Sequence, residues 1–223
     1  MSAPKQIVIL GMGRFGMAVA SELTRLGHEV LAVDVDERVI RESADIATHA
    51  VEADITDQET LKELGVARFD TAIVAIGSDL EASILCTVTL KQLGVSRIIA
   101  KASTEIHGSI LEQVGANRVV YPERETGIRL AHSFAAAGVR DYLDVAPGYG
   151  VAKVVVPTVW IGKSLAELDL RSNYGVTPIA LHRGGGVVLN PHPSEVLLSA
   201  DDLIVAGLDE DLARLPGNED ENR

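Results

Sequence analysis

Apolar and polar positions follow two alternating rhythms along the first two thirds of the chain. Short runs rich in Val, Ile and Ala predict buried strands, and stretches with an apolar residue every three or four positions predict helices. The strands are expected at residues 7–10, 29–34, 48–54, 69–77, 96–103 and 118–122, and the helices after the first at 36–44, 57–64, 80–93, 104–114 and 123–137. Strands that are apolar on both faces and alternate with helices predict an α/β fold, a Rossmann-like doubly wound parallel sheet.

Glycines mark the ends of four of these helices, at Gly65, Gly94, Gly115 and Gly138. Glycine is favoured just after a helix because it adopts the left-handed conformation at little steric cost. The four positions therefore support the predicted helix ends.

The alternation of strands and helices stops around residues 139–150. The remainder of the chain predicts a small α+β module, with strands at 151–157, 176–183, 186–190 and 202–208, one short helix at 164–170 and a last turn at 209–215. Ser164 and Glu167 have the spacing of a capping box for the short helix. We therefore expect two domains, at residues 1–140 and 141–223, the second with an acidic tail.

Composition narrows the class of protein. The 223 residues are 47% apolar and carry a formal charge of −12, which argues against a nucleic-acid partner because such binding needs a basic stripe. No apolar stretch approaches 18 residues and the first residues lack a signal-peptide pattern, so a cytoplasmic location is expected. The single cysteine, Cys86, can form no internal disulfide, and its apolar helical surroundings favour burial.

The strongest chemical signal is the turn after the first strand, Gly11-Met12-Gly13-Arg14-Phe15-Gly16. Gly11 permits the tight turn, Gly13 lets a phosphate approach backbone N–H groups, and Gly16 allows close packing of helix and strand. A phosphate is then favoured at the helix N-terminus. Asp34, at the end of the second strand, is placed to accept both hydroxyls of an adenosine ribose. Together these features predict a nucleotide site.

Arg14 places a positive charge at the start of a helix, which the helix dipole disfavours by roughly 0.3 to 1 kcal/mol. A bound polyphosphate would reverse the sign of that interaction. The alternative is an arginine that simply extends into water, and the sequence leaves both open.

Further candidates follow the carboxyl ends of the other strands, where ligands bind in such sheets. Asp54 and Ile55 follow the third strand, within reach of the adenine face, and the backbone of Ala75, Ile76 and Gly77 is expected to line base and sugar. Lys101 either points a cation into the pocket or reaches water. Glu123 would be repelled by a polyphosphate unless a divalent cation bridged them; otherwise it is a carboxylate at a helix N-terminus.

The chain resembles the regulator of K⁺ conductance (RCK, or KTN) family, and within it the peripheral gating subunits of Ktr and Trk potassium uptake systems. The resemblance covers essentially the whole chain and extends beyond the glycine-rich turn. The most specific segment is L-E-Q-V-G-A-N-R-V-V-Y-P-E-R-E-T-G, and the second domain contributes L-D-L-R-S-N-Y-G-V and D-D-L-I-V-A-G.

The resemblance implies a ligand and partners. ATP or ADP, and in some relatives NAD(H), would bind the first domain, with Gly11, Gly13 and Gly16 on the phosphates, Asp34 on the ribose and Arg14 on the terminal phosphates. Glu123 would hold a divalent cation, Mg²⁺ or Ca²⁺, and Lys101 would lie close by. The subunits would form homodimers that assemble into an octameric ring on the cytoplasmic face of a membrane K⁺ channel subunit.

A second ligand, cyclic di-AMP, binds the second domain of some relatives. Arg171 and Pro191 match positions used there, whereas Thr177 and Pro178 depart from the asparagine and aliphatic residue of known binders. These departures put the second ligand in doubt.

Two other functions compete with this interpretation. An NAD-dependent oxidoreductase would be consistent with Asp34, and Tyr149 and Lys153 imitate the Tyr/Lys pair of short-chain dehydrogenases, but their segment predicts a turn and a strand instead of the helix that pair needs. None of the six histidines has metal-ligand spacing or pairs with an acid so as to select a general base. An NAD(H)-binding redox sensor would use the same first domain. We therefore expect a regulatory protein and no enzyme.

Overall fold

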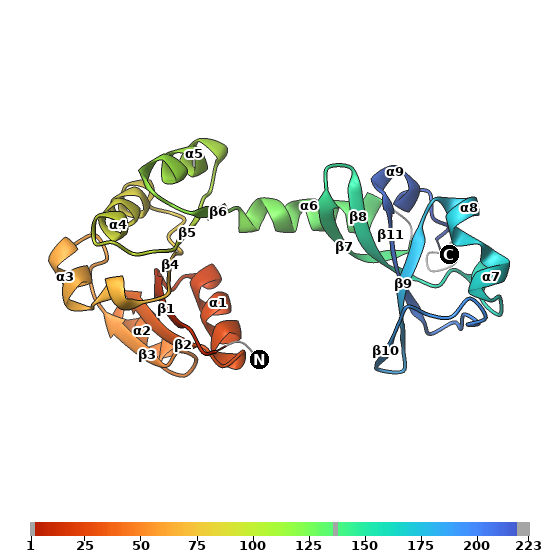
Figure 1. Cartoon of the computed structure of the whole chain (residues 1–223), viewed down its shortest axis with the longest axis horizontal. Coiled ribbons are helices and arrows are strands. Elements are labelled where there is room, and N and C mark those ends of the chain that lie inside the picture. Colours follow the sequence, from red (N-terminus) through yellow and green to blue (C-terminus); the bar gives the residue numbers. More distant parts are fainter. Residues whose placement is uncertain (1–2, 136–137, 218–223) are drawn as a thin grey trace. The chain divides into compact units, whose positions relative to one another are not determined.

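Parallel strands build the first of two units in the computed structural model, which describes residues 3–135 and 138–217. By their contacts the residues divide into units 1–123 and 124–223. In the described part of the first unit, the sheet has six strands in the order β3-β2-β1-β4-β5-β6, all parallel (Figure 1). They are β1 (Gln6–Leu10), β2 (Glu29–Asp34), β3 (His49–Glu52), β4 (Thr71–Val74), β5 (Ile98–Lys101) and β6 (Arg118–Val120).

Helices cover both faces of this sheet, which confirms the doubly wound fold. These helices are α1 (Arg14–Arg25), α2 (Glu37–Ser43), α3 (Gln58–Glu63), α4 (Leu80–Gln92) and α5 (Glu105–Val114). In β1, Ile7 and Ile9 belong to the core that α1 and α2 close, whereas Val8 and Leu10 belong to the core with α3, α4 and α5. The predicted glycines have positive φ angles, from 68° at Gly65 to 124° at Gly115.

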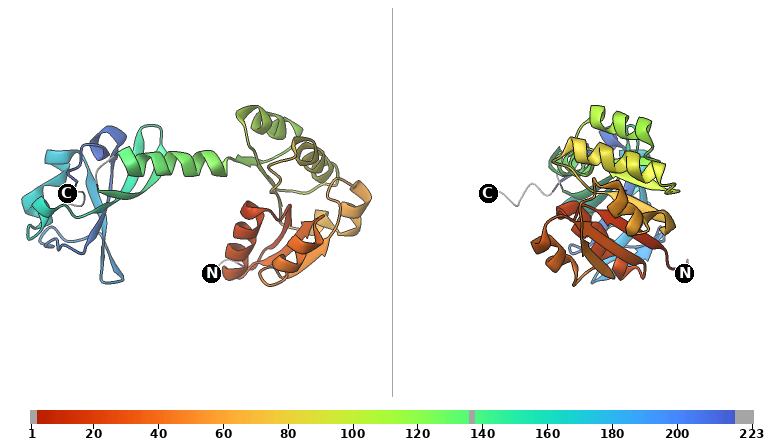
Figure 2. Two further views of the ribbon diagram at one scale, coloured as in Figure 1. Left: turned by 180° about the vertical axis from the view of Figure 1, so that it is seen from behind. Right: turned by 90° about the vertical axis from the view of Figure 1, so that its left-hand side faces the viewer.

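Antiparallel strands form the second unit. In its described part the sheet has five strands in the order β10-β9-β11-β8-β7: β7 (Val139–Ala146), β8 (Tyr149–Val155), β9 (Thr177–Arg183), β10 (Gly186–Leu189) and β11 (Asp202–Leu208). Its short helices are α7 (Leu165–Leu168), α8 (Leu170–Tyr174) and α9 (Asp209–Leu212). The buried core includes Trp160, whose indole N–H donates to the Tyr174 hydroxyl at 3.2 Å. The β9–β10 hairpin extends beyond the other strands of its unit in Figure 1 and in the left view of Figure 2.

Three features of the second unit differ from the sequence prediction or refine it. Strand β7 was not predicted, because only Val139 and Tyr142 of its eight residues are buried and its apolar pattern is correspondingly weak. The expected helix at 164–170 is two helices, since Asp169 has a φ of 37° and breaks the run. The capping box of Ser164 and Glu167 is confirmed, with both of its hydrogen bonds present.

The division between the units falls earlier than residue 140. Helix α6 (Pro122–Ala135) contributes most of its length to the second unit. The His132 ring stacks on Tyr142 of β7 with centroids 3.9 Å apart, and Arg129 lies 3.7 Å from Asp141. These contacts tie the helix to β7, a strand that the sequence pattern did not reveal.

Two neighbouring aspartates, Asp201 and Asp202, form ion pairs in the second unit. The Asp201 side chain is fully buried and accepts two hydrogen bonds from Arg183, at 2.7 and 2.8 Å. Asp202 lies near Arg140 at 3.1 Å, Lys153 at 3.0 Å and His182 at 3.5 Å. The sequence did not predict that His182 lies beside Asp202, because β9 and β11 are neighbours in the sheet but distant in sequence.

The described residues contain no helix that is long and apolar enough to cross a membrane. Cys86 lies on α4 and is completely buried, as predicted. Burial raises the pKa of its thiol to about 12, so the thiolate is scarce at neutral pH.

We predict that Arg183→Met lowers the free energy of unfolding by about 3 kcal/mol, because it leaves Asp201 as a buried charge without a counterion. Arg183 holds the pKa of Asp201 below its usual value, so this stabilisation is complete above about pH 4, the unfolded pKa, and is lost as pH falls through the folded pKa. Urea unfolding at pH 7 and pH 3 measures both effects.

Arg214→Met is the matched control. Arg214 pairs with Asp211 at the surface, and its loss should change the free energy of unfolding by less than about 1 kcal/mol. An equal loss for Arg183→Met at both pH values would contradict the assignment of the stabilisation to the ionised Asp201.

Candidate nucleotide-binding site

The glycine-rich turn that joins β1 to α1 is tightly packed at Gly11 and Gly16. Gly11 has a φ of 96°, a conformation that side chains disfavour. A Cβ at Gly16 would overlap the carbonyl oxygen of Gly11, so the helix packs against the turn at its limit. At Gly13, by contrast, a Cβ would meet no atom within 4 Å. The turn is thus packed against the rest of the protein at Gly11 and Gly16, and it leaves open space at Gly13, where a phosphate could approach the backbone.

The N-terminus of α1 suits an anion. Gly13 is its N-cap and offers no side chain to the first N–H groups, and no acidic residue occupies the first turn. Unpaired N–H groups and the helix dipole together attract negative charge there. Arg14 is exposed at the first helical position, and adds to the positive potential.

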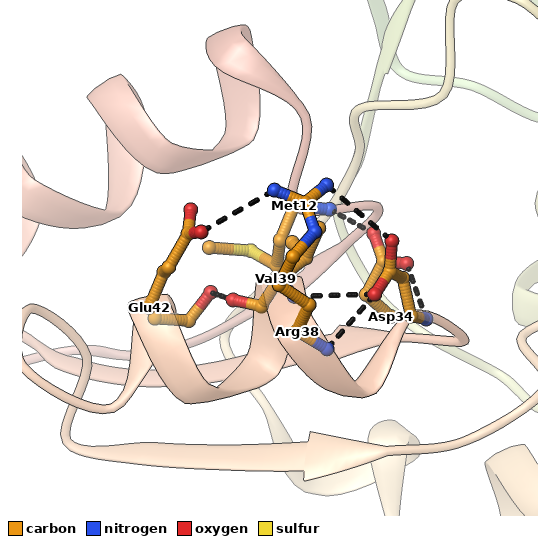
Figure 3. Close-up of polar contacts among 7 residues, drawn as sticks. Met12, Asp34, Arg38, Val39 and Glu42 are labelled. Carbon is orange, nitrogen blue, oxygen red and sulfur yellow. Dashed lines mark hydrogen bonds and ion pairs between the residues drawn. The ribbon is translucent and has the colours of Figure 1, made fainter.

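Asp34 ends β2 and reaches back to the turn (Figure 3). One carboxylate oxygen accepts the Met12 N–H at 2.6 Å, and the other accepts the Asp36 N–H at 3.0 Å. Each oxygen keeps a lone pair for a further donor, such as a ribose hydroxyl. The contact with Met12 involves a backbone group and has no signal in the sequence. Beyond Asp34, Arg38 lies 3.6 Å from Asp36 and 3.4 Å from Glu42.

The residues after β3 divide between the surface and the core. The Ala53 N–H donates to the Asp34 carbonyl oxygen at 2.9 Å, which brings the end of β3 alongside β2. Asp54 is exposed and accepts from the N–H and the hydroxyl of Thr56, hydrogen bonds that lower its pKa. Ile55 is buried in the core, so only its backbone is left to face a ligand.

The end of β4 closes the other side of the turn. The backbone of Ala75 and Ile76 lies against Gly11, and the Ala75 N–H donates to Leu10 in β1 at 2.8 Å. The Ala75 side chain is buried, whereas Ile76 and Gly77 are half-buried. These residues lie beside the glycine-rich turn at the point where the strand order reverses, the usual position of a nucleotide in this fold.

Lys101 and Glu123 form an ion pair on the β5 side. Nζ of Lys101 lies 2.6 Å from Oε1 of Glu123, and 5.9 Å from the centroid of the Phe15 ring. A Cβ on Gly77 would be 2.9 Å from the same nitrogen. The hydrogen bond from Lys101 lowers the pKa of Glu123, with smaller contributions from its own N–H and from the charges of Lys101 and Arg14.

A cation at Glu123 would need ligands from elsewhere. The described residues contain no group of three His, Cys, Asp or Glu side chains that could hold a metal ion. Glu123 is one carboxylate, and its present partner is a lysine. Phosphate oxygens of a nucleotide beside Arg14 would supply the missing oxygen ligands that Mg²⁺ and Ca²⁺ prefer.

Tyr149 and Lys153 do not form a dehydrogenase pair. Both lie on strand β8, so they are roughly 13 Å apart along the chain, as the prediction of a turn and strand requires. Lys153 is engaged with Asp202.

Arg171 and Pro191, the candidates for a second ligand, come together in the second unit. They line an open hollow of about 190 Å³ with Leu165, Ala166, Asp169, Leu170, Pro178 and Pro193. Pro178, which departs from the residue of known binders, is therefore part of the same surface.

Known protein families account for both units. The family model of the TrkA-N domain matches residues 7–122, and that of the TrkA-C domain matches residues 151–215. The Ktr system potassium uptake protein C of Bacillus subtilis (strain 168) is 40% identical over 210 residues, which are 94% of this chain and 95% of that protein. This chain belongs to the TrkA/Ktr group of the RCK family. Ktr system potassium uptake protein A of the same organism is 37% identical with the same coverage.

Solved RCK structures share the fold of this Ktr-type chain. The GsuK channel aligns with a TM-score of 0.69 at 22% identity, covering 100% of this chain and 41% of that one. A structure of the GsuK channel bound to NAD aligns with a TM-score of 0.66 at 23% identity, covering 99% of this chain and 41% of that one. The Ktr-type chain thus spans less than half the length of these channel chains.

Gly13 and Gly16 of this RCK protein should respond differently to alanine. Gly13→Ala meets no atom and should cost less than about 1 kcal/mol of stability, while its methyl group occupies the open space and weakens nucleotide binding about tenfold or more. Gly16→Ala forces α1 off the turn and should lower the melting temperature by about 8 °C or more. Thermal unfolding and titration calorimetry with ADP measure the two effects. Equal melting temperatures for both variants would contradict the close packing at Gly16.

Proposed function

We propose that this protein is a nucleotide-sensing regulatory subunit that gates a membrane K⁺ channel or transporter subunit. The observation that carries the proposal is its identity of 37–40% to two Ktr system potassium uptake proteins over 94% of its length. The open N-terminus of α1, with Arg14, Lys101 and Glu123 nearby, supports ATP or ADP as the ligand. The protein senses a nucleotide and has no catalytic role.

Each residue of the site has a task in this proposal. The N–H groups at Gly13 and Arg14 hold the phosphates, and Asp34 holds the ribose while it keeps Met12 in place. Lys101 and Arg14 meet the terminal phosphates. Glu123 faces a divalent cation that is bound to those phosphates.

Gating follows from differential binding. ATP with a divalent cation favours one conformation of a homo-octameric ring built from dimers, and ADP favours another, so exchange of the nucleotide biases the attached channel. A tenfold difference in affinity between the conformations, about 1.4 kcal/mol, shifts a balanced equilibrium to about ten to one. The ring lies on the cytoplasmic face of the membrane and is held there by its channel partner.

NAD(H) is the alternative ligand, because the fold is shared by a GsuK channel structure bound to NAD and by another bound to ADP. A redox sensor would bind NADH more tightly than ATP or ADP. It would also be indifferent to a divalent cation, since Glu123 has no role in holding a nicotinamide.

The test measures binding and transport together. We expect nucleotide-stripped protein to bind ATP and ADP in titration calorimetry, with Mg²⁺ or Ca²⁺ strengthening ATP binding. Liposomes containing a Ktr membrane subunit and this protein should take up K⁺ several times faster with ATP than with ADP. Equal uptake with both nucleotides would rule out gating by nucleotide exchange, and tighter binding of NADH would favour the redox sensor.

Asp34→Ala and Asp45→Ala form a matched pair for this test. Asp34→Ala removes the ribose acceptor and should weaken ATP and ADP binding about ten- to a hundredfold. Asp45 is exposed in the loop between α2 and β3, so its replacement removes the same charge away from the site and should leave both affinities unchanged.

We propose cyclic di-AMP as a second ligand at the hollow between Arg171 and Pro191, because the structure brings these two residues to one surface. Arg171 is exposed and supplies the cation for a phosphate. We expect Arg171→Ala to weaken cyclic di-AMP binding at least about tenfold in titration calorimetry, and to leave ADP binding unchanged. No heat of binding with the unmodified protein would exclude this ligand.

A further inference from the structure

The Lys101–Glu123 ion pair is strongly asymmetric in its exposure. The side chain of Lys101 is 12% exposed, whereas that of Glu123 is 69% exposed. A largely buried ammonium group needs an anionic partner, because it has lost most of its water. An exposed carboxylate is well solvated without the lysine. The pair therefore matters more to Lys101 than to Glu123, and Glu123 is a partner that another anion can replace.

The position of Lys101 indicates that this other anion is a phosphate of the nucleotide. Its Nζ atom lies next to Gly77 at the end of β4 and 5.9 Å from the ring of Phe15, a residue of the glycine-rich turn. The terminal phosphates of a nucleotide whose first phosphate lies at Gly13 would point toward this side of the crevice. Arg14 lies close enough for its charge to act on Glu123. The charges of Lys101 and Arg14 thus both act on the one carboxylate of Glu123.

We propose that Glu123 is an internal competitor for the terminal phosphate of the nucleotide. The phosphate replaces Glu123 on Lys101, and the released carboxylate turns to the divalent cation that accompanies the phosphate. This inference rests on the proposed nucleotide site. It adds that Lys101 exchanges one anion for another, so that ligand binding breaks an ion pair already present in the free protein.

The exchange explains why a divalent cation should strengthen nucleotide binding. Without a cation, the displaced carboxylate lies beside a phosphate, and the two negative charges repel each other. With a cation, both become its ligands. Glu123 also belongs to the first turn of α6, most of which is part of the second unit. Breaking the pair therefore removes an ion pair that joins the start of this helix to β5.

The experiment is titration calorimetry of the full chain with ADP in a chelating buffer that holds no divalent cation. We expect Glu123→Gln to bind metal-free ADP about three- to tenfold more tightly than the unmodified protein, because Lys101 no longer has a competing anion. Lys101→Met should bind it more weakly. The double variant should gain less over Lys101→Met than Glu123→Gln gains over the unmodified protein, since only the relief of charge repulsion remains without the lysine.

Glu63→Gln is the control for net charge, because Glu63 is an exposed residue at the end of α3 and its replacement should leave the affinity unchanged. An unchanged or weaker affinity of Glu123→Gln would overturn the competitor role and leave the nucleotide site standing. A gain of the same size in the double variant, or an equal gain in Glu63→Gln, would overturn it too. Absence of ADP binding to the unmodified protein would instead refute the proposed function itself.

Discussion

Two residues without side chains allow α1 to begin directly against the turn that leaves β1. The contact between Gly16 and the Gly11 carbonyl group fixes the height of the helix over the sheet, and it leaves the first N–H groups of the helix facing outward. Asp34 then binds the Met12 N–H and ties the turn to the end of β2. The constraint that packs the fold is thus also the constraint that shapes the nucleotide site.

Charges around this turn are distributed by strand. On the β2 side the Asp34 carboxylate could accept hydrogen bonds from the neutral hydroxyl groups of a ribose. On the β5 side Lys101 could bind an anion such as a phosphate. The chain as a whole has a formal charge of −12, whereas Lys101 and Arg14 place positive charge at this turn. They offset the long-range repulsion that an acidic protein exerts on a nucleotide.

The sequence predicted the first unit well because each of its signals is local. Apolar runs, capping residues and glycines after helices all act within a few residues of one another, and six parallel strands follow from them. Features whose determinants are distant in sequence were not predicted. Strand β7 has few buried residues of its own and is held by pairing with β8, and His182 meets Asp202 only across neighbouring strands.

In the nucleotide site, too, the features that depend on residues close in sequence were predicted and those that depend on distant residues were not. The spacing of glycines and acids located Gly13, Gly16 and Asp34 at the crevice, because a strand and its following turn are contiguous in sequence. The partner of Lys101 was not predictable from local pattern, since Glu123 is 22 residues away and begins the helix after β6. Nor does any side-chain pattern reveal that Asp34 accepts a hydrogen bond from the backbone N–H of Met12.

The burial of Cys86 has a practical consequence for spectroscopy. The chain has one cysteine, and its thiol is enclosed in the core of the first unit with a pKa raised to about 12. Thiolates are the nucleophiles that attack maleimides and thiol-reactive nitroxide reagents, so the native protein is nearly silent toward them. A cysteine introduced on the surface of α6 or β10 would then carry a fluorophore or spin label without background, and the existing residue need not be removed first.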